Sequence, residues 1–159
     1  MEASLGLVCL PAMEKHEETA QAMKQTLVTL KARYYEIGDI LAAPRKYLRF
    51  SEAPQDNGHP HIEYEGTQLV YVVTERGRRF RERRTTDPEE LLYWLVSDFT
   101  WEMASDYERK HRVETEDSRQ QLFAKHLELL DSVNPGWAKR KRAEYEDLLL
   151  RHPYQNPIT

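Results

Sequence analysis

The stretch HIEYEGTQLVYVVTERGRRFRERR, residues 61–84, decides the fold of this chain. Polar and apolar residues alternate at its start. QLVYVVT, residues 68–74, is then β-branched or aromatic on both faces, as in a buried strand. Gly66 and Gly77 lie in short turn sequences that separate the extended segments. The stretch therefore predicts a small antiparallel β-meander of about three to four strands, which ends in an arginine-rich run at residues 78–84.

A helical pattern precedes the meander. Its apolar residues recur at alternating spacings of three and four, which places one stripe along a helix from about residue 14 to residue 36. Gly38 and Pro44 are expected to end this helix, and residues 46–50 are expected to be extended. The stripe consists of Ala20, Met23, Leu27, Leu30 and Tyr34.

Three further helices are predicted after the meander. Asp87 as N-cap and Pro88 at the first helical position start one that reaches about residue 112. The next covers about residues 116–133, and the pair Asn134-Pro135 starts the last. One N-terminal helix, a meander and three C-terminal helices predict an α+β fold in which four helices pack on a small sheet.

Length and composition favour a single domain over residues 1–159. Hydrophobic residues make up 40% of the chain and charged residues 31%, which is enough to bury one core without disulfides or metals. No internal repeat or low-complexity linker marks a second domain. Residues 1–13 and 153–159 lie outside the helical patterns and are expected to be loosely held.

Cysteine usage and the N-terminal sequence bear on the compartment. Cys9 is the only cysteine, so the chain forms no internal disulfide, and a reducing compartment fits best. The apolar run at residues 5–10 follows an acidic residue and is too short to span a membrane. We therefore expect a cytoplasmic protein with neither an export signal nor a membrane anchor.

Charge is distributed unevenly along the chain. The net charge is −4, from 23 basic and 27 acidic residues, which argues against a protein that coats nucleic acid. Residues 75–84 contain six arginines and two glutamates and carry +4, so the remaining residues sum to −8. Such patches of opposite sign suit steered docking onto another protein.

The run ERGRRFRERR, residues 75–84, is the most unusual feature. Strand alternation places Arg79, Arg81 and Arg83 on one face. It places Arg78, Phe80, Glu82 and Arg84 on the other. A charged edge strand that prevents aggregation explains the run as well as a binding role does. As a binding surface the run fits an acidic protein patch better than nucleic acid. The candidate partner-binding residues here are Arg76, Arg78, Arg79, Arg81 and Arg83.

Other polar groups are weaker candidates. His59, His61 and Glu63 lie two residues apart and could present metal ligands on one strand face, but a solvated strand edge explains them better. Carboxylates on one helix could act as acid and base, but a solvent-exposed or partner-facing helix flank explains them better. This acidic flank, a second candidate contact region, consists of Asp98, Glu102 and Asp106.

No catalytic residue, metal site or cofactor is assigned. The chain has no P-loop and none of the motifs G-x-S-x-G, H-E-x-x-H or G-x-G-x-x-G. His126 lies beside an apolar helical stripe and is expected to be a hydrogen-bonded core histidine. Arg76, Arg112, Asp117 and Arg119 are expected to make structural ion pairs.

An ordered series of short motifs gives the sequence a family resemblance. The motifs are Pro60-His61-Ile62-Glu63, Tyr71-Val72-Val73, Glu75-Arg76-Gly77, Asp87 with Glu90-Leu91-Leu92-Tyr93-Trp94, Met103-Ala104, Tyr107-Glu108, Arg112 and Asp117-Ser118-Arg119. In this order, over about residues 59–153, they resemble a family of bacterial polymorphic-toxin immunity proteins, immunity protein 63. The helix at residues 14–44 would then be a variable addition.

The resemblance implies a non-enzymatic protein that binds a cognate toxin domain in the cytoplasm of the producing cell and neutralises it. The partner would be the toxin encoded by the adjacent gene, and no cofactor or membrane is implied. One alternative is a nucleic-acid or phosphate-ligand binder that uses the arginine-rich strand at residues 76–84. The other is a metal enzyme that uses His59, His61 and Glu63. Nothing in the sequence indicates a homo-oligomer.

Overall fold

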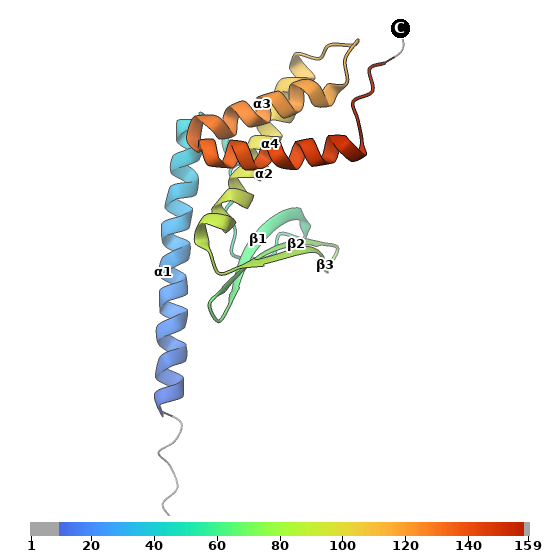
Figure 1. Ribbon diagram of the computed structural model, residues 1–159. Helices are drawn as coiled ribbons and strands as arrows, with labels where there is room; N and C mark the ends of the chain where they lie inside the picture. Colours follow the sequence, from blue (N-terminus) through green and yellow to red (C-terminus); the bar gives the residue numbers. More distant parts are fainter. Residues whose placement is uncertain (1–9, 158–159) are drawn as a thin grey trace, which may run out of the picture. The chain divides into compact units, whose positions relative to one another are not determined.

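A computed structural model describes residues 10–157 of the chain, with four helices and a three-stranded antiparallel sheet (Figure 1). One helix precedes the sheet and three follow it, which confirms the predicted α+β fold. The elements are α1 (Leu10–Ile40), the short 3-10 helix η1 (Arg45–Tyr47), β1 (Asn57–Glu65), β2 (Gln68–Glu75), β3 (Arg78–Thr85), α2 (Pro88–Lys110), α3 (Ser118–Val133) and α4 (Pro135–Arg151).

The chain divides into two compact units. Of the described residues, 10–33 and 50–91 form the first unit, and 34–49 and 92–157 form the second. The first contains most of α1, the sheet and the first turn of α2. The second contains the end of α1, η1, the rest of α2, α3 and α4. The single domain over residues 1–159 stays a prediction.

The sheet of the first unit has the order β1-β2-β3, and both pairs of neighbours are antiparallel. Residues 69–73 of the central strand β2 are all buried, which confirms the strand predicted from QLVYVVT. Cross-strand pairing puts Ile62 beside Tyr71 on one face, and Glu63 beside Val70 on the other. The predicted stripe of α1 is also confirmed, because its residues from Met23 to Tyr34 are buried.

Helix α1 extends beyond its predicted limits at both ends. It begins at Leu10, so residues 10–13 are helical, whereas residues 1–9 lie outside the described part of the chain. The prediction that Gly38 ends the helix is wrong. Ala42 takes a φ of 50°, and the Ala43 amide donates to the Gly38 carbonyl at 2.8 Å, which closes the helix in a Schellman motif. Gly38 instead makes room for Leu48, because a Cβ at residue 38 would lie 2.7 Å from Leu48 Cδ1.

The segment that follows α1 also departs from the prediction. Residues 46–50 were expected to be extended, but Arg45–Tyr47 form η1 after Pro44. The fixed φ of proline suits the start of a helical turn, and the Tyr47 amide donates to the Pro44 carbonyl at 2.9 Å. The extended backbone begins only after this turn, at Leu48.

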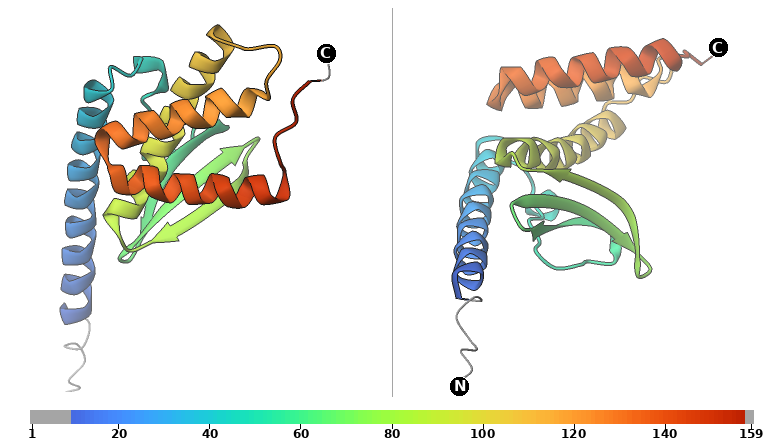
Figure 2. Two further views of the ribbon diagram at one scale, coloured as in Figure 1. Left: turned by 45° about the horizontal axis from the view of Figure 1, so that its top comes forward. Right: turned by 60° about the horizontal axis from the view of Figure 1, so that its bottom comes forward.

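Side-chain caps set the starts of the C-terminal helices. The Asp87 carboxylate accepts from the Glu89 amide at 2.9 Å, and the Asn134 side chain accepts from the Trp137 amide at 3.2 Å. Both caps confirm the sequence prediction. In the second unit α3 and α4 lie side by side (Figure 2). Among residues 10–157, no helix combines the length and apolarity that crossing a membrane requires.

Candidate functional site

A β-bulge in β3 overturns the predicted placement of its arginines. Val73 pairs with Arg81, but the next residue of β2, Thr74, pairs with Arg79. Phe80 is therefore an extra residue in β3, and strand alternation shifts by one position there. The expectation that Arg79 shares a face with Arg81 is wrong, and so is the expectation that Arg78 shares one with Glu82. Sequence alternation alone could not reveal the bulge, because a bulge depends on how two strands pair.

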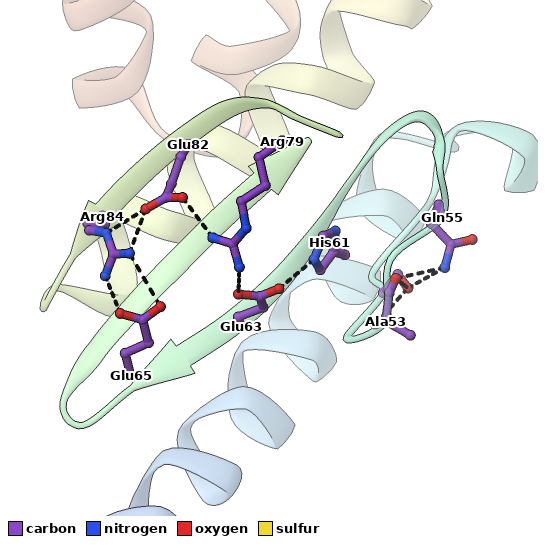
Figure 3. Close-up of polar contacts among 9 residues, drawn as sticks. Ala53, Gln55, His61, Glu63, Glu65, Arg79, Glu82 and Arg84 are labelled. Carbon is purple, nitrogen blue, oxygen red and sulfur yellow. Dashed lines mark hydrogen bonds and ion pairs between the residues drawn. The ribbon is translucent and has the colours of Figure 1, made fainter. Parts of the chain in front are cut away.

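The shift brings Arg79 and Arg84 onto one face of the sheet with three carboxylates (Figure 3). Arg79 donates to Glu63 at 2.6 Å and to Glu82 at 2.7 Å. Arg84 donates to Glu82 at 2.6 Å and to Glu65 at 2.5 Å. These five side chains, from β1 and β3, form one chain of alternating charges that crosses β2, and we call it the charge ladder.

The charge ladder keeps its members ionised. Hydrogen bonding to His61 and to Arg79 holds the pKa of the Glu63 carboxyl below its usual value. Hydrogen bonds from the arginines likewise lower the pKa of Glu65 and of Glu82. Because each guanidinium of the ladder lies between two carboxylates, neither of these arginines offers a free positive charge to a ligand.

The charge ladder lies on a face that also contains buried valines. Val70 pairs with Glu63 and with Arg84, and both cross-strand neighbours carry long aliphatic stems. Val70 and Val72 are fully buried. Long charged side chains cover apolar surface with their stems and keep their charged ends in water. This arrangement explains why β2 is apolar on both faces while one face of the sheet carries charge.

His59, His61 and Glu63, which were weighed as metal ligands, do not come together as a metal site, and the expected solvated strand edge is wrong for His61. His61 is buried and its Nε2 lies 2.9 Å from Glu63 Oε1, while that same carboxylate binds Arg79. Within residues 10–157, no group of three His, Cys, Asp or Glu side chains could hold a metal ion. The His61–Glu63 pair extends the charge ladder at one end.

The other arginines of the run have different surroundings. The Arg83 guanidinium lies 5.2 Å from the centre of the Tyr71 ring, in a cation–π arrangement. Arg76, Arg78 and Arg81 are exposed, and no carboxylate within the described residues pairs with them. Of the five candidate arginines, Arg79 therefore belongs to the charge ladder and Arg83 stacks on Tyr71. The other three pair with no carboxylate of the described residues.

A groove of about 560 Å³ lies beside the turn between β2 and β3. Phe80, the bulge residue, is 74% exposed at this groove. We call this region the turn groove; its lining residues are Glu75, Arg76, Arg78, Arg79 and Phe80. Arginine and aromatic side chains in a concave surface are typical of the strongest contacts in protein–protein interfaces.

The acidic flank is occupied by cations of its own unit. Arg49 Nη1 lies 2.9 Å from Glu102 Oε1, and Lys46 Nζ lies 3.5 Å from Asp106 Oδ2. Arg109 also pairs with Asp106 and lowers the pKa of that carboxyl. Asp98, the third residue of the flank, is half-buried. The flank is therefore not an open acidic surface.

His126 lies in a buried polar cluster of the second unit. Thr100 donates to the Val96 carbonyl at 2.6 Å and so accepts from His126 Nε2, 3.0 Å away. The Tyr145 hydroxyl lies 2.5 Å from His126 Nδ1 and donates to it. Burial lowers the pKa of His126 to about 3, so the ring is neutral. The predicted core histidine is confirmed, but its partners on two other helices were not predictable.

Two of the expected ion pairs are structural. Arg112 binds Glu108 through two hydrogen bonds of 2.9 Å. Arg119 binds Asp117, the N-cap of α3, and its guanidinium also donates to the carbonyls of His152 and Pro153 at 2.9 Å. These expectations are confirmed, whereas Arg76 forms no ion pair with any residue between 10 and 157.

Asp117 also binds the C-terminal segment that was expected to be loose. The Gln155 amide donates to Asp117 Oδ2 at 2.8 Å, and the Asn156 side chain accepts from the Asp117 amide at 3.1 Å. Hydrogen bonds from the Arg119 guanidinium and from the Gln155 amide hold the pKa of the Asp117 carboxyl well below its usual value. Residues 153–157 therefore have no helix or strand but are bound to the start of α3.

Comparison with known proteins identifies a family. The family model of immunity protein 63 matches residues 65–147, just over half of the chain. The match includes β2, β3, α2, α3 and most of α4, and leaves out α1. Comparison with curated proteins and with solved structures finds no match. The resemblance expected from the short motifs is confirmed, and this chain belongs to the immunity protein 63 family.

Proposed function

We propose that this chain binds the active domain of a cognate bacterial toxin in the cytoplasm of the producing cell and neutralises it. Membership of the immunity protein 63 family is the observation that carries the proposal. The partner is the toxin encoded by the adjacent gene. Neutralisation occurs by occlusion of the toxin's site or target surface, and the chain performs no catalytic step.

The surface of the first unit supports a binding role. Phe80 and the unpaired Arg76, Arg78 and Arg81 lie on β3 or on the turn before it, inside the segment that the family model matches. Aromatic and arginine side chains contribute most of the binding energy in many interfaces. The ion pairs of the charge ladder restrict the side chains of Arg79 and Arg84, which reduces the entropy lost on binding.

The acidic flank is a second proposed contact region. Asp98, Glu102 and Asp106 could receive cations of the toxin only in competition with Arg49 and Lys46. This competition makes us expect a smaller contribution from the flank than from the arginine strand.

The distribution of polar groups favours a binding protein over a nucleic-acid binder or an enzyme. Carboxylates compensate Arg79 and Arg84, so the arginine strand is less basic than its sequence suggests. In the second unit, His126 is neutral and 2% exposed, and both of its ring nitrogens are hydrogen-bonded inside the protein. An acid–base catalyst would need access to a substrate.

Co-expression with the neighbouring toxin tests the proposal. The chain, with an affinity tag, is produced together with the C-terminal domain of the secreted protein encoded beside it. We expect the two to purify as a complex and the cells to survive, whereas cells with the toxin domain alone stop growing. Persistent toxicity, or a neighbouring protein without toxicity, would contradict the proposed function.

A further inference from the structure

The turn between β2 and β3 carries a residue that is unfavourable for the turn itself. Arg76 and Gly77 both have positive φ, 51° and 73°. Two-residue hairpin turns of this kind prefer Asn-Gly, because most other side chains are strained in the left-handed region. Arginine at residue 76 therefore does not optimise the turn, and such local strain often marks a functional position.

The bulge next to this turn exposes an aromatic side chain. Phe80 is unpaired in the register between β2 and β3, and 74% of it is accessible to solvent. An exposed phenylalanine adds nothing to the core of an isolated protein and favours association with another surface. The bulge residue Phe80 and the turn residue Arg76 both line the turn groove.

The charges around the turn groove define what would fit into it. Arg76 and Arg78 have no carboxylate partner within the described chain. Among the described residues that line the groove, Glu75 is the only carboxylate. Arg79 also lines the groove, but Glu63 and Glu82 hold its guanidinium, so it supports the wall of the groove.

We propose that the turn groove is the toxin-binding site, and that its occupant is an acidic segment of the toxin. Carboxylates of that segment pair with Arg76 and Arg78, and an apolar side chain of the toxin packs on Phe80. Arg79 acts as a positioning residue. This inference rests on the proposed function and adds to it the location of the interface and the chemistry of the partner.

A protein segment fits the groove better than nucleic acid does. Single-stranded nucleic acid is bound by several aromatic side chains along a basic channel. The turn groove offers one aromatic ring and two unpaired arginines, and the Glu75 carboxylate would repel a phosphate. A peptide segment can present its acidic and apolar groups in alternation and avoid Glu75.

Three variants of the groove and two control variants, all as purified proteins, test the inference. The probe is the toxin domain encoded by the adjacent gene, in a catalytically inactive form. We expect Phe80→Ala to raise the Kd at least about tenfold. Arg78→Glu is expected to lower the association rate about tenfold at low salt, with a smaller effect at high salt. Arg76→Asn should weaken binding while the thermal midpoint stays equal or rises, since asparagine suits the turn.

The matched controls lie on α4. They are Leu150→Ala, at an 84% exposed position, and Arg142→Glu, which is also exposed. Both should bind the toxin domain with a Kd within about twofold of wild type.

The outcomes separate this inference from the proposed function. If the wild-type chain binds the toxin domain and the three groove variants bind as tightly, the inference is overturned and the function stands. If the wild-type chain does not bind, both fail. Binding of a single-stranded 20-mer that Arg78→Glu abolishes would assign the groove to nucleic acid. A dimer in light scattering that Phe80→Ala converts to a monomer would assign it to self-association, and either result would overturn the inference.

Discussion

The charge ladder of the first unit and the buried cluster around His126 in the second unit both supply polar side chains with hydrogen-bond partners. The ladder does so with charged groups and the cluster with neutral ones. In the ladder, full charges alternate at 2.5 to 2.7 Å on an accessible face, and hydrogen bonds keep the carboxyls ionised. In the cluster, three uncharged side chains from three helices bind one another, and burial keeps the histidine neutral.

Accessible and buried polar side chains contribute differently to the stability of the fold. Water competes with an exposed ion pair, so the ladder adds little to stability and mainly fixes side-chain positions. A buried polar group has no access to water, so the loss of its partner is costly. The cluster should therefore determine stability, whereas the ladder should determine which surface the chain presents.

The largest expected effect is that of His126→Ala. The substitution opens a cavity and leaves Thr100 and Tyr145 without a partner, and such changes cost about 2–4 kcal/mol. Urea unfolding measures the loss in free energy of unfolding. His111→Ala, at an exposed position near the end of α2, is the control and should change the value by less than about 0.5 kcal/mol. Equal losses in the free energy of unfolding for the two substitutions would contradict the claim that the buried cluster determines stability.

The next effect is a loss of stability in mild acid. The pKa of His126 is about 3 in the folded chain and 6.5 ordinarily. Between these values the unfolded chain binds the extra proton, so the free energy of unfolding falls as the pH falls, by about 1.4 kcal/mol per pH unit. From pH 6.5 to pH 5 the wild type should lose about 1–2 kcal/mol more than His126→Gln. Parallel pH curves for the two proteins would show that His126 is not the titrating group.

Asp117→Ala tests a polar group that is intermediate in exposure between the charge ladder and the buried cluster. Asp117 is a partly accessible charge, but it also caps α3 and binds the Gln155 amide. Loss of the cap should cost about 1–2 kcal/mol. Hydrogen exchange at the Gln155 amide should become faster, because its acceptor is removed. The neighbouring Ser118→Ala serves as control, and unchanged exchange in Asp117→Ala would show that the tail is held by other contacts.

The smallest expected effect on stability is that of Glu82→Gln. The substitution removes the carboxylate that lies between Arg79 and Arg84 in the charge ladder. The urea midpoint should not change measurably, since these groups are accessible to water. Toxin binding should weaken, because Arg79 loses one of the two carboxylates that fix it. A shift in midpoint as large as that of Asp117→Ala would mean that the ladder stabilises the fold.

Several features of the fold could be predicted because they depend on neighbours in the sequence. The Asp87 cap forms with an amide two residues away, and the Asn134 cap forms with one three residues away. The buried stripe of α1 follows from helical spacing alone. The end of α1 could not be predicted, since Ala42 takes the position that glycine usually occupies, and Gly38 is required by the distant Leu48.

The candidate site was only partly predictable, because the pairing of its charges depends on residues that are distant in the sequence. Unpaired Arg76 and Arg78 and the exposed Phe80 belong to a run whose composition is visible in the sequence. Which arginines are compensated depends on the bulge at Phe80 and on carboxylates of β1, more than ten residues away along the chain.

The order of the four α-helices and three strands, the buried central strand and the family could be predicted from the sequence alone, because periodicity, caps and short motifs are local properties. The tertiary structure decided that Arg79 and Arg84 are compensated while Arg76 and Arg78 are not, that His126 binds Thr100 and Tyr145, and that the C-terminal segment is bound by Asp117. The physical reason is that hydrogen bonds and ion pairs act over about 3 Å, so they depend on which distant residues the fold brings together.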